Sequence, residues 1–257
     1  MQGMANVDVF QRHSTSWKNS LMLDYKQSKH SFYVARFISE CGLKLIMEAW
    51  TVSLAASYYH KCMKSVSEKD VDPYVVATSC LYLASKNDNR PLRLRDILNV
   101  AHSTIHRDSG VLDLTEEYWS LRDSVVQAEL LLLRTLEFNT TVNLPHKYML
   151  YYLDSLRQWI SPEVWSQVPI IRTSWSFLQD FFHDPSSIDH RPQHIAISVV
   201  YLTLQCYGVT IPGACDIEGK TWYEIFCKDM KKETIWSIID KIVNIYEKEQ
   251  AILEQKD

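Results

Sequence analysis

The sequence predicts an all-α protein built from two repeats of one helical plan. Glycine is scarce, at 6 of 257 residues, which favours packed helices over a turn-rich β fold. Apolar residues recur every three or four positions through most of the chain, and this is the period of an amphipathic helix. Two segments, beginning at Pro73 and Pro192, both read P-x-x-(V/I)-A-x-S-x-x-Y-L without a gap. Such a match indicates an internal duplication.

Five helices are predicted in the first half. The third has the clearest start, because Asp72 is a favoured N-cap and Pro73 then occupies the first helical position. Small residues at Ala77 and Ser79 allow close approach, so neighbouring helices are expected to surround it. The predicted ranges are Phe32–Leu45, Trp50–Met63, Pro73–Lys86, Arg93–Ala101 and Leu114–Phe138, with His102–Val111 as a loop.

The second half repeats this plan after a β-branched, proline-ended linker at Thr140–Pro145. Its predicted helices are Pro145–Ile160, Val168–His183, Pro192–Gln205, Trp222–Cys227 and Glu233–Glu249. The expected organisation is a flexible lead over residues 1–29 with a short helix near Leu21–Tyr25, a first repeat over 30–140, a second over 141–249, and a tail over 250–257.

Composition narrows the classes of partner. The net charge is −4, which gives no general attraction to nucleic acid or anionic lipid. The uncharged stretch Ile195–Ile211 is shorter than the ~20 residues that span a bilayer, so a buried core helix is expected there, and no signal peptide is expected. The six cysteines form no C-x-x-C pair, which favours reduced thiols in the cytosol or nucleus.

No catalytic or cofactor motif is found. The glycine-rich phosphate loops, the G-x-S-x-G elbow and the kinase signatures are all absent from the sequence. His102 and His106, and likewise His190 and His194, stand four apart but have no third ligand in view, so they are interpreted as surface histidines. We therefore expect no metal, no cofactor and no enzymatic activity.

One charged pair stands out as a candidate binding site. Lys86 ends the third helix, where the helix dipole favours a cation. Glu129 lies in the fifth helix with apolar neighbours one turn away, where a carboxylate needs a cation or hydrogen-bond donors. A pairing of the two and an outward-pointing Glu129 are about equally compatible with the periodicity. The position that matches Lys86 in the second repeat is the neutral Gln205.

Several short motifs resemble the cyclin family. Ala84-Ser85-Lys86 closes the third helix, and Glu129 is followed by the apolar run that ends at Phe138. The other matching motifs are Tyr59-His60-Lys61, Pro145-His146-Lys147-Tyr148 and Trp222-Tyr223-Glu224. The resemblance covers about residues 30–247 and implies two tandem five-helix cyclin boxes.

The resemblance also implies a function. Cyclins are activating subunits without catalysis of their own, which form a heterodimer with a cyclin-dependent kinase in the nucleus and cytoplasm. Lys86 and Glu129 match the family's kinase-contacting lysine and glutamate, and Leu83 and Leu133 match apolar contacts beside them. Three runs, Arg95–Val100, Tyr118–Gln127 and Arg191–His194, resemble a branch of the family whose partner is cyclin-dependent kinase 10, so this kinase is the implied partner.

Two departures from the family and two other functions are considered. Cell-cycle cyclins carry an M-R-A-I-L substrate-docking patch where this chain has His30–Val34, so docking of R-x-L substrates is not expected. Asn87–Arg90 keeps one of two acidic residues that many cyclins have there. A two-box DNA-binding transcription factor would share the fold, but the net charge argues against it. A non-activating scaffold that binds peptides is the other alternative.

Overall fold

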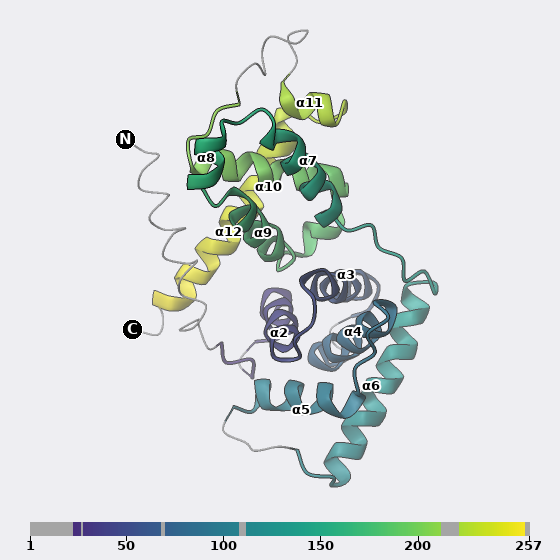
Figure 1. The fold of residues 1–257 in the computed structure, drawn as a ribbon. Helices are drawn as coiled ribbons and strands as arrows, with labels where there is room; N and C mark the ends of the chain where they lie inside the picture. Colours follow the sequence, from purple (N-terminus) through teal and green to yellow (C-terminus); the bar gives the residue numbers. More distant parts are fainter. Residues whose placement is uncertain (1–22, 27, 68–69, 108–111, 212–220, 255–257) are drawn as a thin grey trace. The chain divides into compact units, whose positions relative to one another are not determined.

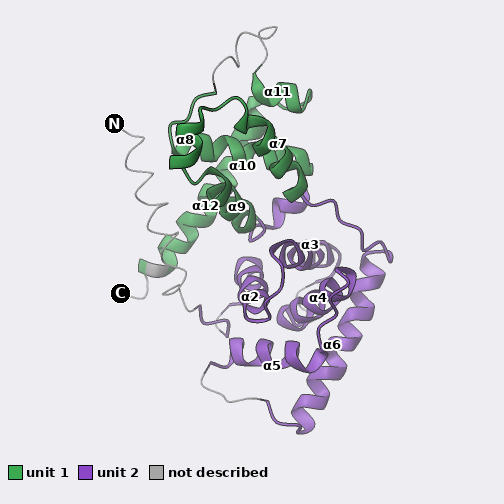
Figure 2. Ribbon diagram, in the orientation of Figure 1, with its two compact units in different colours: residues 1–22, 145–181, 190–257 green, residues 23–144, 182–189 purple. Residues whose placement is uncertain are grey.

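The computed structural model describes the chain except residues 1–22, 27, 68–69, 108–111, 212–220 and 255–257. Within the described residues all regular structure is helical and no strand occurs, which confirms the all-α prediction. These residues form two compact units (Figure 2). The N-terminal unit holds Leu23–Leu144 and Phe182–Asp189, and the C-terminal unit holds Pro145–Phe181 and the described residues from His190 onward.

The described residues of the N-terminal unit form five α-helices, four of which pack around a central one. They are α2 (Ser31–Lys44), α3 (Ala49–Ser65), α4 (Pro73–Asn87), α5 (Leu94–Ile105) and α6 (Glu116–Thr135). Helix α4 contacts the other four, and α6 runs along it as the longest helix of this unit (Figure 1). The 3-10 helix η2 (Pro185–Ile188) contacts α3.

Helix α4 begins and packs as its sequence predicts. The Asp72 carboxylate accepts a hydrogen bond from the Tyr74 amide at 3.0 Å, and Pro73 follows this cap. Ser79 is fully buried, and its hydroxyl donates to the Val125 carbonyl of α6 at 2.8 Å. A small side chain at this position therefore lets α6 approach the backbone of α4.

The C-terminal unit repeats the central helix. Its helices are α7 (His146–Arg157), α8 (Pro162–Gln167), α9 (Ile170–Phe181), α10 (Pro192–Cys206), α11 (Trp222–Phe226) and α12 (Lys232–Glu254). Helix α10 contacts α7, α9 and α12 (Figure 1). Ala196 and Ser198 of this helix are fully buried. The core helix expected at Ile195–Ile211 is thus confirmed up to Cys206, and no described helix has the length and hydropathy of a membrane span.

Several predicted boundaries require correction. Helix α5 continues to Ile105, so His102 lies in a helix and not in a loop. Helix α8 was not predicted, although Ser161 caps it and Pro162 begins it. Helix α12 runs to Glu254, through the start of the predicted tail. Part of the short helix predicted near Leu21–Tyr25 lies outside the described residues, and the described residues 23–25 are not helical.

The predicted flexible lead also ends earlier than expected. Leu23 and Tyr25 are only 2% and 3% exposed. The Tyr25 hydroxyl donates to the Glu40 carboxylate at 2.7 Å, and its ring packs edge-on against Phe37 and Tyr74. Leu23 and Tyr25 therefore belong to the core of the N-terminal unit. Burial of Tyr25 costs little, because its hydroxyl has a hydrogen-bond partner.

The cysteines of the described residues are all free thiols. Cys41, Cys62 and Cys80 are buried, whereas Cys206 and Cys227 are half-buried, and Cys215 lies outside the described residues. Burial raises the pKa of the Cys41 thiol to about 12. A thiol with so high a pKa stays protonated and unreactive at neutral pH.

Candidate functional site

Lys86 and Glu129 form the charged pair of the candidate site. The Lys86 Nζ donates to both carboxylate oxygens of Glu129, at 2.7 and 3.0 Å, and so joins the end of α4 to the middle of α6. The predicted proximity is confirmed, and the alternative of an outward-pointing Glu129 is wrong. Its side chain is only 12% exposed, so the carboxylate needs this cation to offset its desolvation.

Lys86 keeps the capacity to bind a further group. Its side chain is 40% exposed, and its ammonium also lies 3.8 Å from the ring centroid of Tyr82, one turn earlier in α4. An ammonium has three N–H donors, and Glu129 uses two oxygens on one side of it. The remaining donor can therefore reach an acceptor on another protein.

The residues after Lys86 fix the end of α4. The Asp88 carboxylate accepts hydrogen bonds from Trp50 at 3.2 Å and from Thr51 at 2.6 Å, both at the start of α3. Asn89 has a φ of 54°, a left-handed conformation that asparagine tolerates better than most residues. Arg90 pairs with Glu48 at 2.6 Å. The contacts of Asp88 and Arg90 therefore anchor the end of α4 to the start of α3.

Apolar side chains surround the charged pair on α6. Val126 and Leu130 are 36% and 52% exposed, and Leu133 is half-buried. With Glu129 they occupy positions three or four apart, so they share one face of the helix. Leu83, the other predicted apolar contact, is buried at 6% exposure on α4, one turn before Lys86. Val126 and Leu130 were missed because α6 is apolar on most of its circumference.

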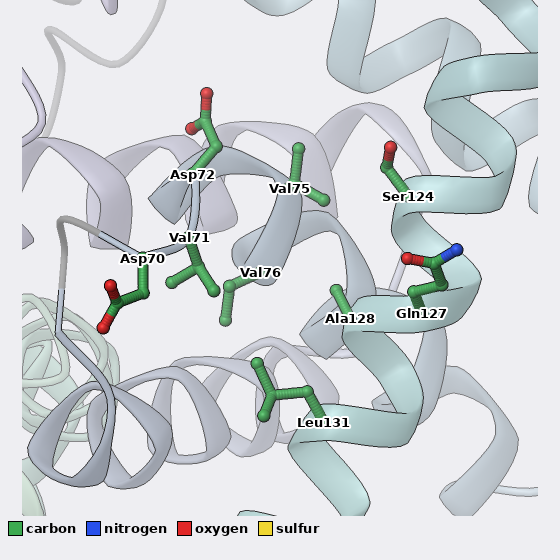
Figure 3. Close-up of a pocket in the computed structure, with 9 residues that line it drawn as sticks. All are labelled: Asp70, Val71, Asp72, Val75, Val76, Ser124, Gln127, Ala128 and Leu131. Atoms are coloured by element: carbon green, nitrogen blue, oxygen red, sulfur yellow. The ribbon is translucent and has the colours of Figure 1, made fainter.

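A separate pocket lies against another face of α6. It has a volume of about 440 Å³ and lies between the α3–α4 connection, the start of α4 and α6 (Figure 3). Asp70 and Asp72 contribute carboxylates, and Val71, Val76 and Leu131 contribute apolar side chains. On α6 the pocket residues are Ser124, Gln127, Ala128 and Leu131. This set and the set containing Glu129 point in different directions by helical geometry, so the pocket is not part of the charged-pair site.

The four histidines considered as metal ligands are half-buried, which corrects their interpretation as surface residues. The rings of His102 and His106 are tilted by 31° to each other, with centroids 4.6 Å apart. His190 contacts the Lys241 ammonium at 2.9 Å, whereas His194 faces Asp229 at 3.5 Å. His190 and His194 therefore have different partners, although they stand four residues apart in the sequence.

The fold is an all-helical module, and the face around Lys86 and Glu129 is its candidate binding surface. Exposed apolar side chains rimmed by polar groups, such as Val126 and Leu130 beside Lys86, are typical of surfaces that contact other proteins. A family model described as the N-terminal domain of cyclin matches residues 9–141, about half of the chain. The chain belongs to the cyclin family, whose members are regulatory subunits and not catalysts.

Several cyclins are similar to this chain along much of its length. The chain is 25% identical to cyclin-K of Danio rerio over 86% of its own length and 51% of that protein. It is 28% identical to cyclin-L1 of Gallus gallus, over 69% of its length and 32% of that protein. Cyclin pch1 of Schizosaccharomyces pombe is 25% identical, with shares of 82% and 60%. The chain thus spans between about a third and three fifths of these relatives.

A solved structure shows the same fold. A chain of the yeast RNA polymerase II CTD kinase CTDK-1 complex superposes with a TM-score of 0.63, covering 93% of this chain and 71% of that one. The sequence identity is 19%. This likeness confirms a cyclin-like arrangement of helices.

Proposed function

We propose that this protein binds and activates a cyclin-dependent protein kinase through the face formed by Lys86, Glu129 and Leu133, with Leu83 beneath them. The observation that carries the proposal is the Lys86–Glu129 pair, with Lys86 at 40% exposure and Nζ held 2.7 Å from the carboxylate. The same two residues match the kinase contacts of the family. The solved structure with the same fold comes from a kinase complex.

The mechanism follows from what such a face can do. A kinase is active only when its mobile helix is held inward, so that a lysine and a glutamate of the kinase pair and the activation loop is released. The exposed Val126 and Leu130 supply apolar area for that helix, and the free N–H of Lys86 supplies a donor for a backbone carbonyl. A stable heterodimer of this kind buries about 1,200–2,000 Å² or more in total.

The particular protein we propose is a cyclin Q, with cyclin-dependent kinase 10 as its partner. The runs Arg95–Val100, Tyr118–Gln127 and Arg191–His194 support this closer assignment. The similar structure is described as a kinase complex for the CTD of RNA polymerase II, which supports a role in the nucleus. We propose the cytoplasm as a second location.

The test is the charge reversal Lys86→Glu, assayed with purified cyclin-dependent kinase 10 for binding and for kinase activity. The variant places two carboxylates together and presents a negative charge to acceptor groups of the kinase. Loss of one member of a buried charged contact costs roughly 2–5 kcal/mol, a factor of about 30 or more in affinity. Binding and activation are expected to fall together.

Two controls separate binding from folding. Lys29→Glu is the matched control. Lys29 lies before α2 and pairs on the surface with Asp72, the N-cap of α4, at 3.5 Å. This substitution should leave kinase affinity unchanged. The exchange Lys86→Glu with Glu129→Lys restores an internal ion pair while it reverses the charges offered to the kinase. This double variant should melt close to the native protein and still fail to bind. Native affinity in either Lys86 variant would show that the binding face lies elsewhere.

A further inference from the structure

Three side chains with metal-binding atoms converge in the C-terminal unit, two from one short segment and one from a distant helix. They are His194 in the first turn of α10, and Cys227 and Asp229 directly after α11. One potential ligand atom from each lies within 4.8 Å of the others. The Cys227 thiol donates to one Asp229 oxygen at 2.9 Å, and the His194 Nε2 lies 3.5 Å from the other oxygen.

The environment of His194 supports a bound ligand at this cluster. Its Nε2 atom is buried and makes no hydrogen bond within the described part of the chain, although the Asp229 carboxylate stands opposite. A buried ring nitrogen without a hydrogen bond is costly. A metal ion between the nitrogen, the thiolate and the carboxylate would satisfy it.

The frame around the cluster is rigid. Phe226, directly before Cys227, stacks with Trp159 at an interplanar angle of 4° and with Tyr152 at 18°. Met230, directly after Asp229, is 2% exposed. The segment that carries two of the ligands is therefore anchored at both ends, and the third ligand is fixed on the central helix α10. Such anchoring lowers the entropy that a ligand set loses on binding.

The chemistry of the donors selects the metal. One thiolate, one imidazole and one carboxylate suit Zn²⁺, with bond lengths of about 2.0–2.3 Å. Tetrahedral bonds of that length place ligand atoms roughly 3.3–3.8 Å apart, so the cluster needs to close by about 1 Å. A surface group competes for the same carboxylate, because Arg191 pairs with Asp229 and is 70% exposed. Its side chain can swing into solvent.

We propose that His194, Cys227 and Asp229 form a zinc-binding site, with water as the fourth ligand. On binding, the Cys227 S–H bond breaks, the proton passes to solvent, and the sulfur lone pair binds the metal; no electron is transferred. The site ties the segment after α11 to the start of α10. It is independent of the kinase-binding face, so either proposal can fail while the other holds.

The test is a Co²⁺ titration of the full chain after treatment with a chelator, followed by displacement with Zn²⁺. Bound Co²⁺ should show a thiolate charge-transfer band, which Cys227→Ser should abolish. His194→Asn should weaken binding by at least about tenfold, since even loss of an outer-shell partner costs 10–100-fold. Arg191→Gln should strengthen binding, because it removes a cation that competes for the Asp229 carboxylate.

Matched controls remove other ligands of the same kind. Cys206→Ser deletes the other half-buried thiol among the described residues, and His106→Asn removes one ring of the neighbouring His102–His106 pair. Neither change should alter the Co²⁺ spectrum or affinity. A measurement on the native protein avoids any folding defect of a variant. Zn²⁺ should slow alkylation of Cys227, read by mass spectrometry, and leave that of Cys206 unchanged. No Co²⁺ thiolate band, or equal alkylation of Cys227 with and without Zn²⁺, would overturn the proposal.

Discussion

The two central helices, α4 and α10, are built alike but end differently. Both begin with proline and carry buried Ala-x-Ser at the same positions, Ala77-x-Ser79 and Ala196-x-Ser198. Helix α4 ends in a cation paired with a carboxylate of α6, whereas α10 carries the exposed neutral Gln205 at the matching position.

This difference separates the residues that make the fold from those that make the site. The proline start and the small buried residues are shared, since they determine how closely neighbouring helices can pack around the central one. The charged pair lies at a helix end, where a change of one side chain leaves that packing intact. A duplicated scaffold can therefore acquire a binding face in one unit alone.

Acidification should destabilise both units, because each contains at least one buried histidine. In the C-terminal unit, the loss of unfolding free energy from His146 should be measurable. Burial lowers the pKa of His146 to about 4, and burial lowers the pKa of His60 and His183 in the N-terminal unit. The unfolded chain takes up protons first, at the ordinary histidine pKa of about 6.5. The stability from a neutral buried histidine is therefore complete above pH 6.5 and is lost as the pH falls toward the folded pKa.

For His146 the expected loss is about 3 kcal/mol between pH 6.5 and 4. The check is denaturant unfolding across this range for the native protein and for His146→Gln, which keeps an acceptor for the Gln179 amide. The variant should show a shallower decline. Equal slopes for the two proteins would mean that His146 does not titrate as its burial requires.

The matched serines of the central helices should respond oppositely to alanine. Ser79 donates to the Val125 carbonyl at 2.8 Å, whereas the buried hydroxyl of Ser198 has no partner among the described residues. Ser79→Ala should cost about 1 kcal/mol of unfolding free energy, and Ser198→Ala should be neutral or stabilising by up to about 1 kcal/mol. Chemical denaturation measures both. A loss at Ser198 as large as that at Ser79 would reveal a hydrogen bond of Ser198 through water.

The features of the fold that sequence predicts are those with strong local signals. The starts of α4 and α10 are marked by proline and by the repeated pattern, and both were predicted at the correct residue. Helix α8 was missed because six residues carry too little periodicity to detect. Burial of Tyr25 could not be foreseen, because it depends on Glu40 and Phe37, which only the tertiary structure brings near.

The site was predictable in part, for a similar reason. Lys86 and Glu129 could be chosen because each is a charge in an apolar setting, but periodicity alone could not decide between pairing and an outward Glu129. Val126 and Leu130 could not be told from core residues by type. His194 and Cys227 come together only in the folded protein. Helical spacing in the sequence pairs His194 with His190 instead, so it could not reveal this cluster.

Adding a cation to α10 tests whether one charge suffices to make a binding face. Of the predicted changes in unfolding free energy, this one is expected to be the smallest. Gln205→Lys reproduces the Lys86 position in the C-terminal unit. A cation in the last turn of a helix is favoured by the dipole, so stability should rise by at most about 0.5 kcal/mol. Kinase affinity should not change, because the proposed face needs the lysine, its carboxylate and the exposed Val126 and Leu130 together. The decisive comparison adds Gln205→Lys to Lys86→Glu: if the added cation restores kinase binding, the asymmetry between the two units does not reside in the Lys86–Glu129 pair.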